Sequence, residues 1–223
     1  MDRKLVIPSL FFAAIAVIFV ASAVKPSDKA SLKMIMDLLR IPQTLERFKT
    51  GNEVEYQSHD LRVLKFSWHN CGSADDPVKV KDVTLTPDPV KLPGEVKTGF
   101  TAQLLKTVDK PIKAALVIKK KVLFAWIEVP CVDSVGSCTY TDLCAKIPGK
   151  PTDACPPPLS TYNIPCHCPF KAGNYTLPPS NFDLPSIGSL PEWLEEGDYS
   201  VQATISSNST RLACYRAELS LTK

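Results

Sequence analysis

The stretch CVDSVGSCTYTDLCAKIPGKPTDACPPPLSTYNIPCHC, residues 131–168, holds six of the eight cysteines of this 223-residue chain. The other two, Cys71 and Cys214, lie far outside it, one on each side. An even cysteine count is typical of a disulfide framework made in an oxidising compartment. The layout predicts one long-range disulfide that closes a domain and a compact region held by three short ones. It leaves the individual pairings open.

Within this stretch, Cys166-His167-Cys168 is the one cluster that could suggest a metal site. Thiolate and imidazole groups bind zinc, but structural zinc sites use two paired ligand sets, and the second set is missing here. We therefore expect disulfides and no metal or other cofactor. Two cysteines one residue apart are expected to pair with different partners.

The N-terminus has the features of a secretory signal over residues 1–23. Arg3 and Lys4 precede an apolar stretch over residues 5–20, and Ala21-Ser22-Ala23 has the small-x-small form of a cleavage site. Because the apolar stretch is short for a membrane span, a retained anchor is the weaker alternative. The mature chain is expected to begin near Val24 and to be soluble.

Two sequences are acceptors for N-linked glycans, Asn174-Tyr175-Thr176 and Asn208-Ser209-Thr210. Both agree with passage through the secretory pathway, and both are expected on exposed turns. The net charge of +3 is small, and no basic nucleic-acid-binding motif is present, so the sequence does not indicate nucleic-acid binding.

Residues 24–63 differ from the rest of the chain because they contain no cysteine. Ser31 is a candidate cap for a short amphipathic helix with apolar residues on one face, namely Leu32, Ile35, Met36 and Leu39. We interpret this region as an N-terminal extension or propeptide, with a membrane-surface helix as the alternative. The domain is expected to cover residues 64–223.

The twenty prolines exclude long helices from much of this domain and favour short strands. Alternating or β-rich patterns predict strands over residues 78–86, 99–105, 114–118 and 122–129. Alternation over 199–205 and 215–221, around a turn at 206–210, predicts a hairpin. The spacing indicates an all-β, antiparallel sandwich or cup, with helical turns only at 141–146 and 190–195.

The chain has few groups suited to catalysis. It contains three histidines, and it has neither a Gly-x-Ser-x-Gly elbow nor a His-Glu-x-x-His helix. The paired carboxylates Asp75-Asp76 and Glu195-Glu196 are interpreted as solvated turn charges, because adjacent residues of a strand point to opposite faces. The sequence therefore does not predict an enzyme. Trp68, beside Cys71, is expected to pack under the long disulfide.

From residue 66 to the end, the sequence resembles the ganglioside-activator branch of the MD-two-related lipid-recognition family. All eight cysteines and all three tryptophans lie at family positions. The motifs that carry the resemblance include Phe66-Ser67-Trp68-His69-Asn70-Cys71, Trp126-Ile127-Glu128-Val129-Pro130-Cys131, Cys166-His167-Cys168-Pro169-Phe170-Lys171 and Leu190-Pro191-Glu192-Trp193-Leu194.

The resemblance implies a β-cup with an apolar lipid cavity. It also implies the pairings Cys71–Cys214, Cys131–Cys138, Cys144–Cys168 and Cys155–Cys166, with the clustered bridges around the mouth of the cup. The implied activity is non-enzymatic: extraction of gangliosides from membranes, lipid transfer, and presentation to β-hexosaminidase A in the lysosome. A general carrier of sterol or phospholipid is the main alternative, and a lipase or a disulfide-rich inhibitor is less favoured.

The resemblance also implies a lipid-binding and membrane-facing rim. The sequence pattern of residues 122–126 alone predicts a core strand, whereas the family resemblance implies an exposed apolar loop from Val122 to Trp126. The implied rim residues are Val122, Leu123, Phe124, Trp126, Leu190, Trp193, Leu194 and Tyr199. Lys119, Lys120 and Lys121 directly precede this loop and are hypothesised to hold it on anionic membranes.

The sequence departs from the family pattern just after Pro93-Gly94. The usual family glycosylation site is absent there, because Glu95-Val96-Lys97 occupies the position. Asn174 and Asn208 offer sites instead.

Overall fold

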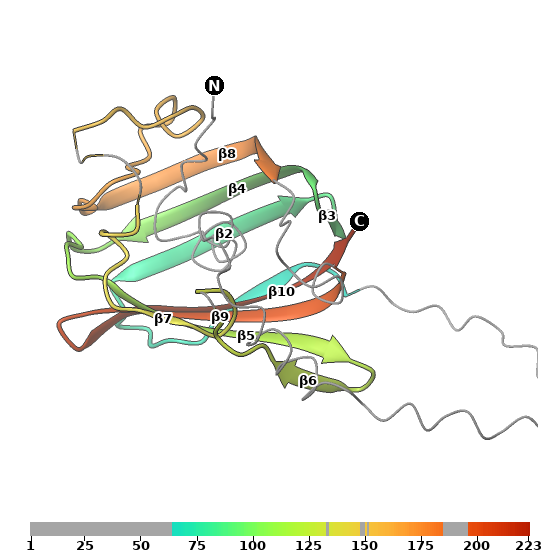
Figure 1. Ribbon diagram of the computed structural model, residues 1–223. Coiled ribbons are helices and arrows are strands. Elements are labelled where there is room, and N and C mark those ends of the chain that lie inside the picture. Colours follow the sequence, from blue (N-terminus) through green and yellow to red (C-terminus); the bar gives the residue numbers. More distant parts are fainter. Residues whose placement is uncertain (1–63, 133, 148–149, 151, 185–195) are drawn as a thin grey trace, which may run out of the picture.

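The fold is an all-β sandwich of two sheets, described from a computed structural model over residues 64–132, 134–147, 150, 152–184 and 196–223. The small sheet has the strand order β2 (Val78–Thr86), β4 (Gly94–Leu104) and β8 (Gly173–Leu184). It lies over the large sheet in Figure 1. The expected all-β class is confirmed, and the expected amphipathic helix before residue 64 lies outside the described residues.

The large sheet has the main order β1-β10-β9-β5-β6, and its strands are antiparallel along this path. Two short strands attach to it: β3 pairs parallel with β10, and β7 pairs antiparallel with β5. The bounds are β1 Ser67–Asn70, β3 Val90–Lys91, β5 Lys113–Val122, β6 Ala125–Glu128, β7 Thr139–Tyr140, β9 Gly197–Ser207 and β10 Thr210–Thr222.

The main core lies between the two sheets, because the alternating apolar side chains of both sheets point inward. Its members include Val78, Leu85, Val96, Leu104 and Leu184 from the small sheet and Leu116, Ile118, Val201, Ile205, Leu219 and Leu221 from the large one. The predicted C-terminal hairpin is present as β9 and β10, with Asn208 and Ser209 forming the turn.

A second apolar cluster attaches the disulfide-rich segment to the small sheet. Leu159, Ile164 and Cys166 pack there with apolar side chains of β4 and β8, namely Phe100, Ala102 and Leu177. The sequence patterns did not predict this cluster. Residues 141–146, a predicted helical turn, form a hydrogen-bonded turn in which the Lys146 amide donates to the Leu143 carbonyl.

Strand β8 is an edge strand that sequence reasoning missed because it contains Pro178 and Pro179. Its register with β4 shifts between Thr98 and Phe100, so these prolines sit at an irregularity where no ladder donor is needed. Gly99 faces this irregularity: a Cβ there would lie 2.8 Å from the Leu177 carbonyl oxygen. A side chain at residue 99 would therefore clash with the β8 backbone.

Asn208 lies on an exposed turn, as expected. Asn174 is also exposed, but it lies within β8 and pairs with Gln103. The expectation of a turn is therefore wrong for Asn174, because the edge strand already begins at Gly173.

The four disulfides join Cys71 to Cys214, Cys131 to Cys138, Cys144 to Cys168 and Cys155 to Cys166, the pairs that the resemblance implied. Cys166 and Cys168 thus bond to different partners. No free cysteine remains among the described residues.

Candidate functional site

The hairpin of β5 and β6 ends in two exposed apolar side chains. Val122 pairs with Ala125, so the connection consists of only Leu123 and Phe124. Leu123 is 75% exposed and Phe124 is 101% exposed. We call these two residues the apolar tip. Two large apolar side chains at an exposed turn mark a surface that is suited to a membrane or an apolar ligand.

The backbone of the tip explains why the sequence alone read as a continuous strand. A two-residue hairpin turn usually contains Asn, Asp or Gly, because positive φ is needed. Here Leu123 takes a φ of 55° without any of these residues in the turn. The apolar run over residues 122–129 is therefore broken by a turn that carries no sequence signal.

The first residues of β6 extend the apolar surface from the tip. Trp126 is 37% exposed and pairs across the hairpin with Lys121. Val122, also predicted for the rim, is half-buried at the end of β5. Both lie next to the tip in the hairpin that projects at the lower right of Figure 1.

Tyr199 lies inward from the tip. Only 6% of it is exposed, and it belongs to the core between the sheets. Its burial raises the pKa of its phenol well above the ordinary value. The expected rim position is therefore corrected: Tyr199 is an interior residue of β9, opposite Lys120 in the register.

Lys120 and Lys121 are tied to the start of β9. The Lys120 ammonium lies 5.5 Å from the centre of the Tyr199 ring and donates to the Glu196 carbonyl. Burial lowers the pKa of Lys120, and the nearby Glu196 charge partly opposes this shift. Lys121 Nζ lies 3.6 Å from Asp198 Oδ2. Both lysines thus hold the hairpin against β9.

The other predicted apolar loop, with Leu190, Trp193 and Leu194, lies outside the described residues. The residues that flank it, Leu184 and Gly197, end β8 and begin β9. Gly197 has a φ of 120°, and a Cβ there would lie 3.1 Å from Cε of Lys120. The start of β9 therefore packs closely against the base of the tip hairpin.

The two ends of the sandwich differ in what they carry. We call the end that carries the apolar tip the tip end. At this end, Leu221 of β10 pairs with Gly197 of β9 on one side and with Val90 of β3 on the other. We call the opposite end, with the β9–β10 turn, the distal end. Lys113 pairs with Ser206 near that turn, and Val122 is nine residues further along β5, or about 30 Å away.

The Cys144–Cys168 bridge lies toward the distal end. The Leu143 amide donates to the Ile112 carbonyl just before β5, and Phe170 pairs with Val108. Cys144–Cys168 therefore lies away from the apolar tip, and the expectation that the clustered bridges surround the mouth of the cup stays a prediction. The second bridge, Cys155–Cys166, packs in the cluster on β4 and β8.

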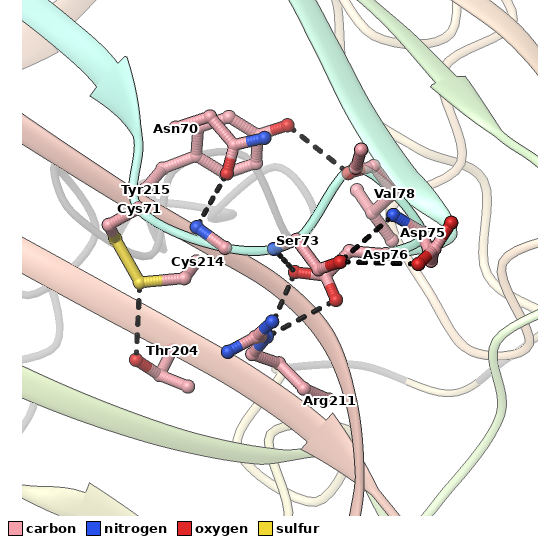
Figure 2. Close-up of polar contacts among 12 residues, drawn as sticks. Asn70, Cys71, Ser73, Asp75, Asp76, Val78, Thr204, Arg211, Cys214 and Tyr215 are labelled. Atoms are coloured by element: carbon pink, nitrogen blue, oxygen red, sulfur yellow. Dashed lines mark hydrogen bonds and ion pairs between the residues drawn. A yellow bond between two sulfur atoms is a disulfide. The ribbon is translucent and has the colours of Figure 1, made fainter.

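The acidic pair Asp75-Asp76 also departs from expectation. Asp75 is exposed, as predicted for a turn charge, whereas only 7% of Asp76 is exposed. Figure 2 shows the Asp76 carboxylate facing Arg211, near the Cys71–Cys214 disulfide. Sequence reasoning missed this partner because 135 positions separate the two residues.

Trp68 lies in β1, half-buried, with its ring centroid 6.1 Å from that of Tyr215. The Tyr215 hydroxyl accepts from the Val80 amide and donates to the Val78 carbonyl. Among the described residues, no cluster of histidine, cysteine or acidic side chains is arranged to hold a metal ion. Over the same residues, no helix is long and apolar enough to span a membrane.

A family model described as the ML domain matches residues 65–221. This chain belongs to the ML-domain family. The family is that of MD-2-related lipid-recognition proteins. Two curated relatives carry the name ganglioside GM2 activator. The one from Mus musculus is 42% identical over 158 residues, covering 70% of this chain and 81% of the relative.

The relative from Macaca fascicularis is 41% identical over 170 residues, which cover 74% of this chain and 87% of the relative. A solved structure of a Niemann-Pick type C2 protein from Japanese carpenter ant aligns with 70% of this chain and 99% of its own. Its sequence identity is 12% and the TM-score is 0.37.

Proposed function

We propose that this ML-domain protein is a non-enzymatic activator that extracts gangliosides from membranes and presents them to β-hexosaminidase A in the lysosome. The observation that carries the proposal is the apolar tip, which lies at one end of a two-sheet sandwich with an apolar interior. The names of the two curated relatives support the lipid class and the activator role.

The energetics of lipid extraction require an apolar host. Exposing one CH₂ group to water costs about 0.8 kcal/mol, so an acyl chain of about 16 carbons costs more than about 10 kcal/mol to bring into water. A carrier must therefore bury the tails as they leave the bilayer. In this proposal the tails lie between the two sheets, and the sugar headgroup stays outside at the tip end.

The tip supplies the first contact with the membrane. Leu123 and Phe124 enter the bilayer surface, and Trp126 lies at the interface, where an indole ring can place its apolar body in lipid and its N–H in water. Because the tip is only two residues long and its hairpin is held to β9 by Lys120 and Lys121, it is presented in one orientation.

Basic side chains beside the tip add attraction to anionic lipids, each worth about 1 kcal/mol near such a surface. Lys121 already faces Asp198 and Lys120 faces Glu196, so in this proposal Lys119 contributes most. Lys119→Ala should weaken extraction from anionic vesicles and leave extraction from neutral vesicles unchanged. An equal effect on both vesicle types would contradict this role.

The proposed function is tested with vesicles that contain a fluorescent ganglioside. The protein alone should release ganglioside from the vesicles without hydrolysing it. Adding β-hexosaminidase A should then give hydrolysis faster than with the glycosidase alone. Transfer without stimulation would instead indicate a general lipid carrier, and hydrolysis by the protein alone would indicate an enzyme.

A further inference from the structure

Lys120 is a charged residue on the apolar inner face of the large sheet. Alternation along β5 turns Leu116 and Ile118 into the core between the sheets, and Lys120 is the next residue of this series. Its partner in β9 is Tyr199, whose ring also lies in the core. The adjacent Lys121 belongs to the opposite face. Lys120 therefore lies where the apolar interior of the sandwich meets the tip end.

The Lys120 side chain is held in place over the end of this interior. Its ammonium lies 5.5 Å from the centre of the Tyr199 ring and donates to the Glu196 carbonyl. Gly197 allows this close approach, because a Cβ there would lie 3.1 Å from Cε of Lys120. An ammonium has three N–H donors, so it can keep a protein contact while it binds an anion.

The surroundings of Lys120 favour an anionic ligand. The side chain is half-buried, and burial lowers the pKa of its ammonium. Charges interact more strongly where water is partly excluded. An anion that reaches Lys120 is therefore bound more strongly than one that meets an exposed lysine on the outer surface.

Lys121 offers a matched comparison within the same hairpin. It carries the same charge and is also tied to the start of β9, since its Nζ lies 3.6 Å from Asp198 Oδ2. Asp198 Oδ1 in turn accepts from the Ser220 hydroxyl. Lys121 is exposed and lies on the outer face. The two lysines thus differ mainly in which face of the sheet they occupy.

The distance of Lys120 from the apolar tip matches the headgroup layer of a membrane. Leu123 lies three positions further along the chain, or about 10 Å away along an extended strand. The polar layer on each side of a bilayer is about 5–8 Å thick. When the tip enters the bilayer surface, Lys120 therefore lies at the level of the lipid headgroups.

We infer that Lys120 binds the anionic headgroup of the lipid whose tails lie between the two sheets, and that it makes the protein select anionic over neutral lipids. This inference rests on the proposed function for the position of the tails. The chemistry that Lys120 recognises is an anionic oxygen of the headgroup. Either the carboxylate of a sialic acid or the phosphate of a phospholipid supplies it.

The first experiment measures selectivity in the wild-type protein. Phosphatidylcholine vesicles carry a trace of one fluorescent lipid, so that all samples have nearly the same surface charge. One pair of lipids is a monosialoganglioside and the same glycolipid without its sialic acid. The other pair is phosphatidylglycerol and phosphatidylcholine with the same acyl chains. Within each pair, only one headgroup has a net negative charge.

We expect the anionic member of at least one pair to be extracted about tenfold better, as a charged hydrogen bond provides. A preference in the first pair identifies the carboxylate as the ligand, and a preference in the second identifies the phosphate. No preference in either pair would overturn the inference. This measurement does not depend on the folding of any variant.

The second experiment changes the charge at residue 120. Lys120→Met keeps a long apolar side chain without the charge, and Lys120→Arg keeps the charge. Lys121→Met is the matched control on the opposite face. In Lys120→Met the about tenfold preference should fall to about one, whereas Lys120→Arg and Lys121→Met should retain it. Thermal unfolding checks that each variant is folded.

A purely structural role of Lys120 predicts a different result. If Lys120 only held the hairpin against β9, Lys120→Met would reduce extraction of both members of a pair alike and leave their ratio unchanged. That outcome would overturn the inference, as would an equal loss of preference in Lys121→Met. Failure of the proposed function is distinct, because the wild-type protein would then extract neither glycolipid or would not stimulate β-hexosaminidase A.

Discussion

Arg211 and Asp76 form an ion pair that joins the two sheets at the distal end. Arg211 Nε lies 2.9 Å from Oδ2 and 3.2 Å from Oδ1 of Asp76. Arg211 belongs to β10 of the large sheet, and Asp76 precedes β2 of the small sheet. Asp76 Oδ2 also accepts from the Ser73 amide, so one buried carboxylate fixes both the loop after Cys71 and the start of β10.

Asp76→Asn should lower the free energy of unfolding by about 1.5–3 kcal/mol, the range for hydrogen bonds to charged groups. The Arg211 side chain is 44% exposed, which places the effect toward the lower part of this range. Chemical denaturation measures the change. The neighbouring exposed carboxylate provides the control, and Asp75→Asn should change stability by less than about 0.5 kcal/mol. Similar losses for the two variants would show that the ion pair does not stabilise the fold.

The long disulfide should stabilise the fold more than the shortest one. Cys71 and Cys214 are 143 positions apart, whereas Cys131 and Cys138 are 7 apart. The chain-entropy relation gives about 5 kcal/mol for the long loop and about 2 kcal/mol for the short one at 25 °C. Replacing each pair by alanines and measuring thermal unfolding tests this order. A larger loss for the Cys131–Cys138 variant would reverse it.

Phe124→Ser should weaken vesicle binding by roughly ten- to a hundredfold, because burying such a side chain is worth about 1.5–3 kcal/mol. Leu105 is the matched control. It is also a large exposed apolar residue, at 56% exposure, but it follows the distal end of β4. Leu105→Ser should therefore bind vesicles as the wild type does. Co-sedimentation with vesicles measures both, and equal losses would remove the special role of the tip.

Burial of Tyr199 should make the fold sensitive to alkaline pH. Its phenol has a raised pKa in the folded protein, so the folded state holds the proton more tightly than the unfolded chain. The resulting contribution to the free energy of unfolding is fully present below about pH 10, the ordinary pKa of a tyrosine, and is lost as the pH rises above it. Tyr199→Phe should therefore lose less stability between about pH 9 and about pH 11 than the wild type does.

Denaturation curves at the two pH values measure this effect. In Tyr199→Phe the loss of stability at alkaline pH should be reduced and not abolished, because burial also raises the pKa values of Tyr140, Tyr175 and Tyr215. The comparison at about pH 9 separates ionisation from any packing effect of the missing hydroxyl. An unchanged pH profile in Tyr199→Phe would show that this phenol does not govern the alkaline loss.

The elements with regular alternation could be predicted from sequence because burial on one face imposes a period of two. The hairpin of β9 and β10 and the strand β2 are examples. Strand β8 could not, because Pro178 and Pro179 are evidence against a strand unless the strand is at an edge. Whether a strand is at an edge depends on the pairing of the whole sheet.

The candidate site, too, could be predicted from the sequence only in part. The exposure of Leu123 and Phe124 followed from the family resemblance, whereas their apolar character alone indicated a core strand. Tyr199 was placed on the rim because it follows an apolar loop in the sequence. Instead, Tyr199 pairs with Lys120 in the large sheet, and its ring lies in the core between the sheets. Likewise, the pairing of Asp76 with Arg211 depends on how the two sheets stack, which no local pattern specifies.

The two prolines of β8 also affect how the molecule behaves among its own copies. An open sheet edge has unpaired backbone donors and acceptors that can pair with a strand of another molecule. Such pairing is a common cause of aggregation into fibrils. Pro178 and Pro179 carry no backbone N–H, and the register irregularity beside them interrupts the ladder. A second molecule therefore cannot extend the small sheet continuously along β8, which favours colloidal stability when the protein is concentrated.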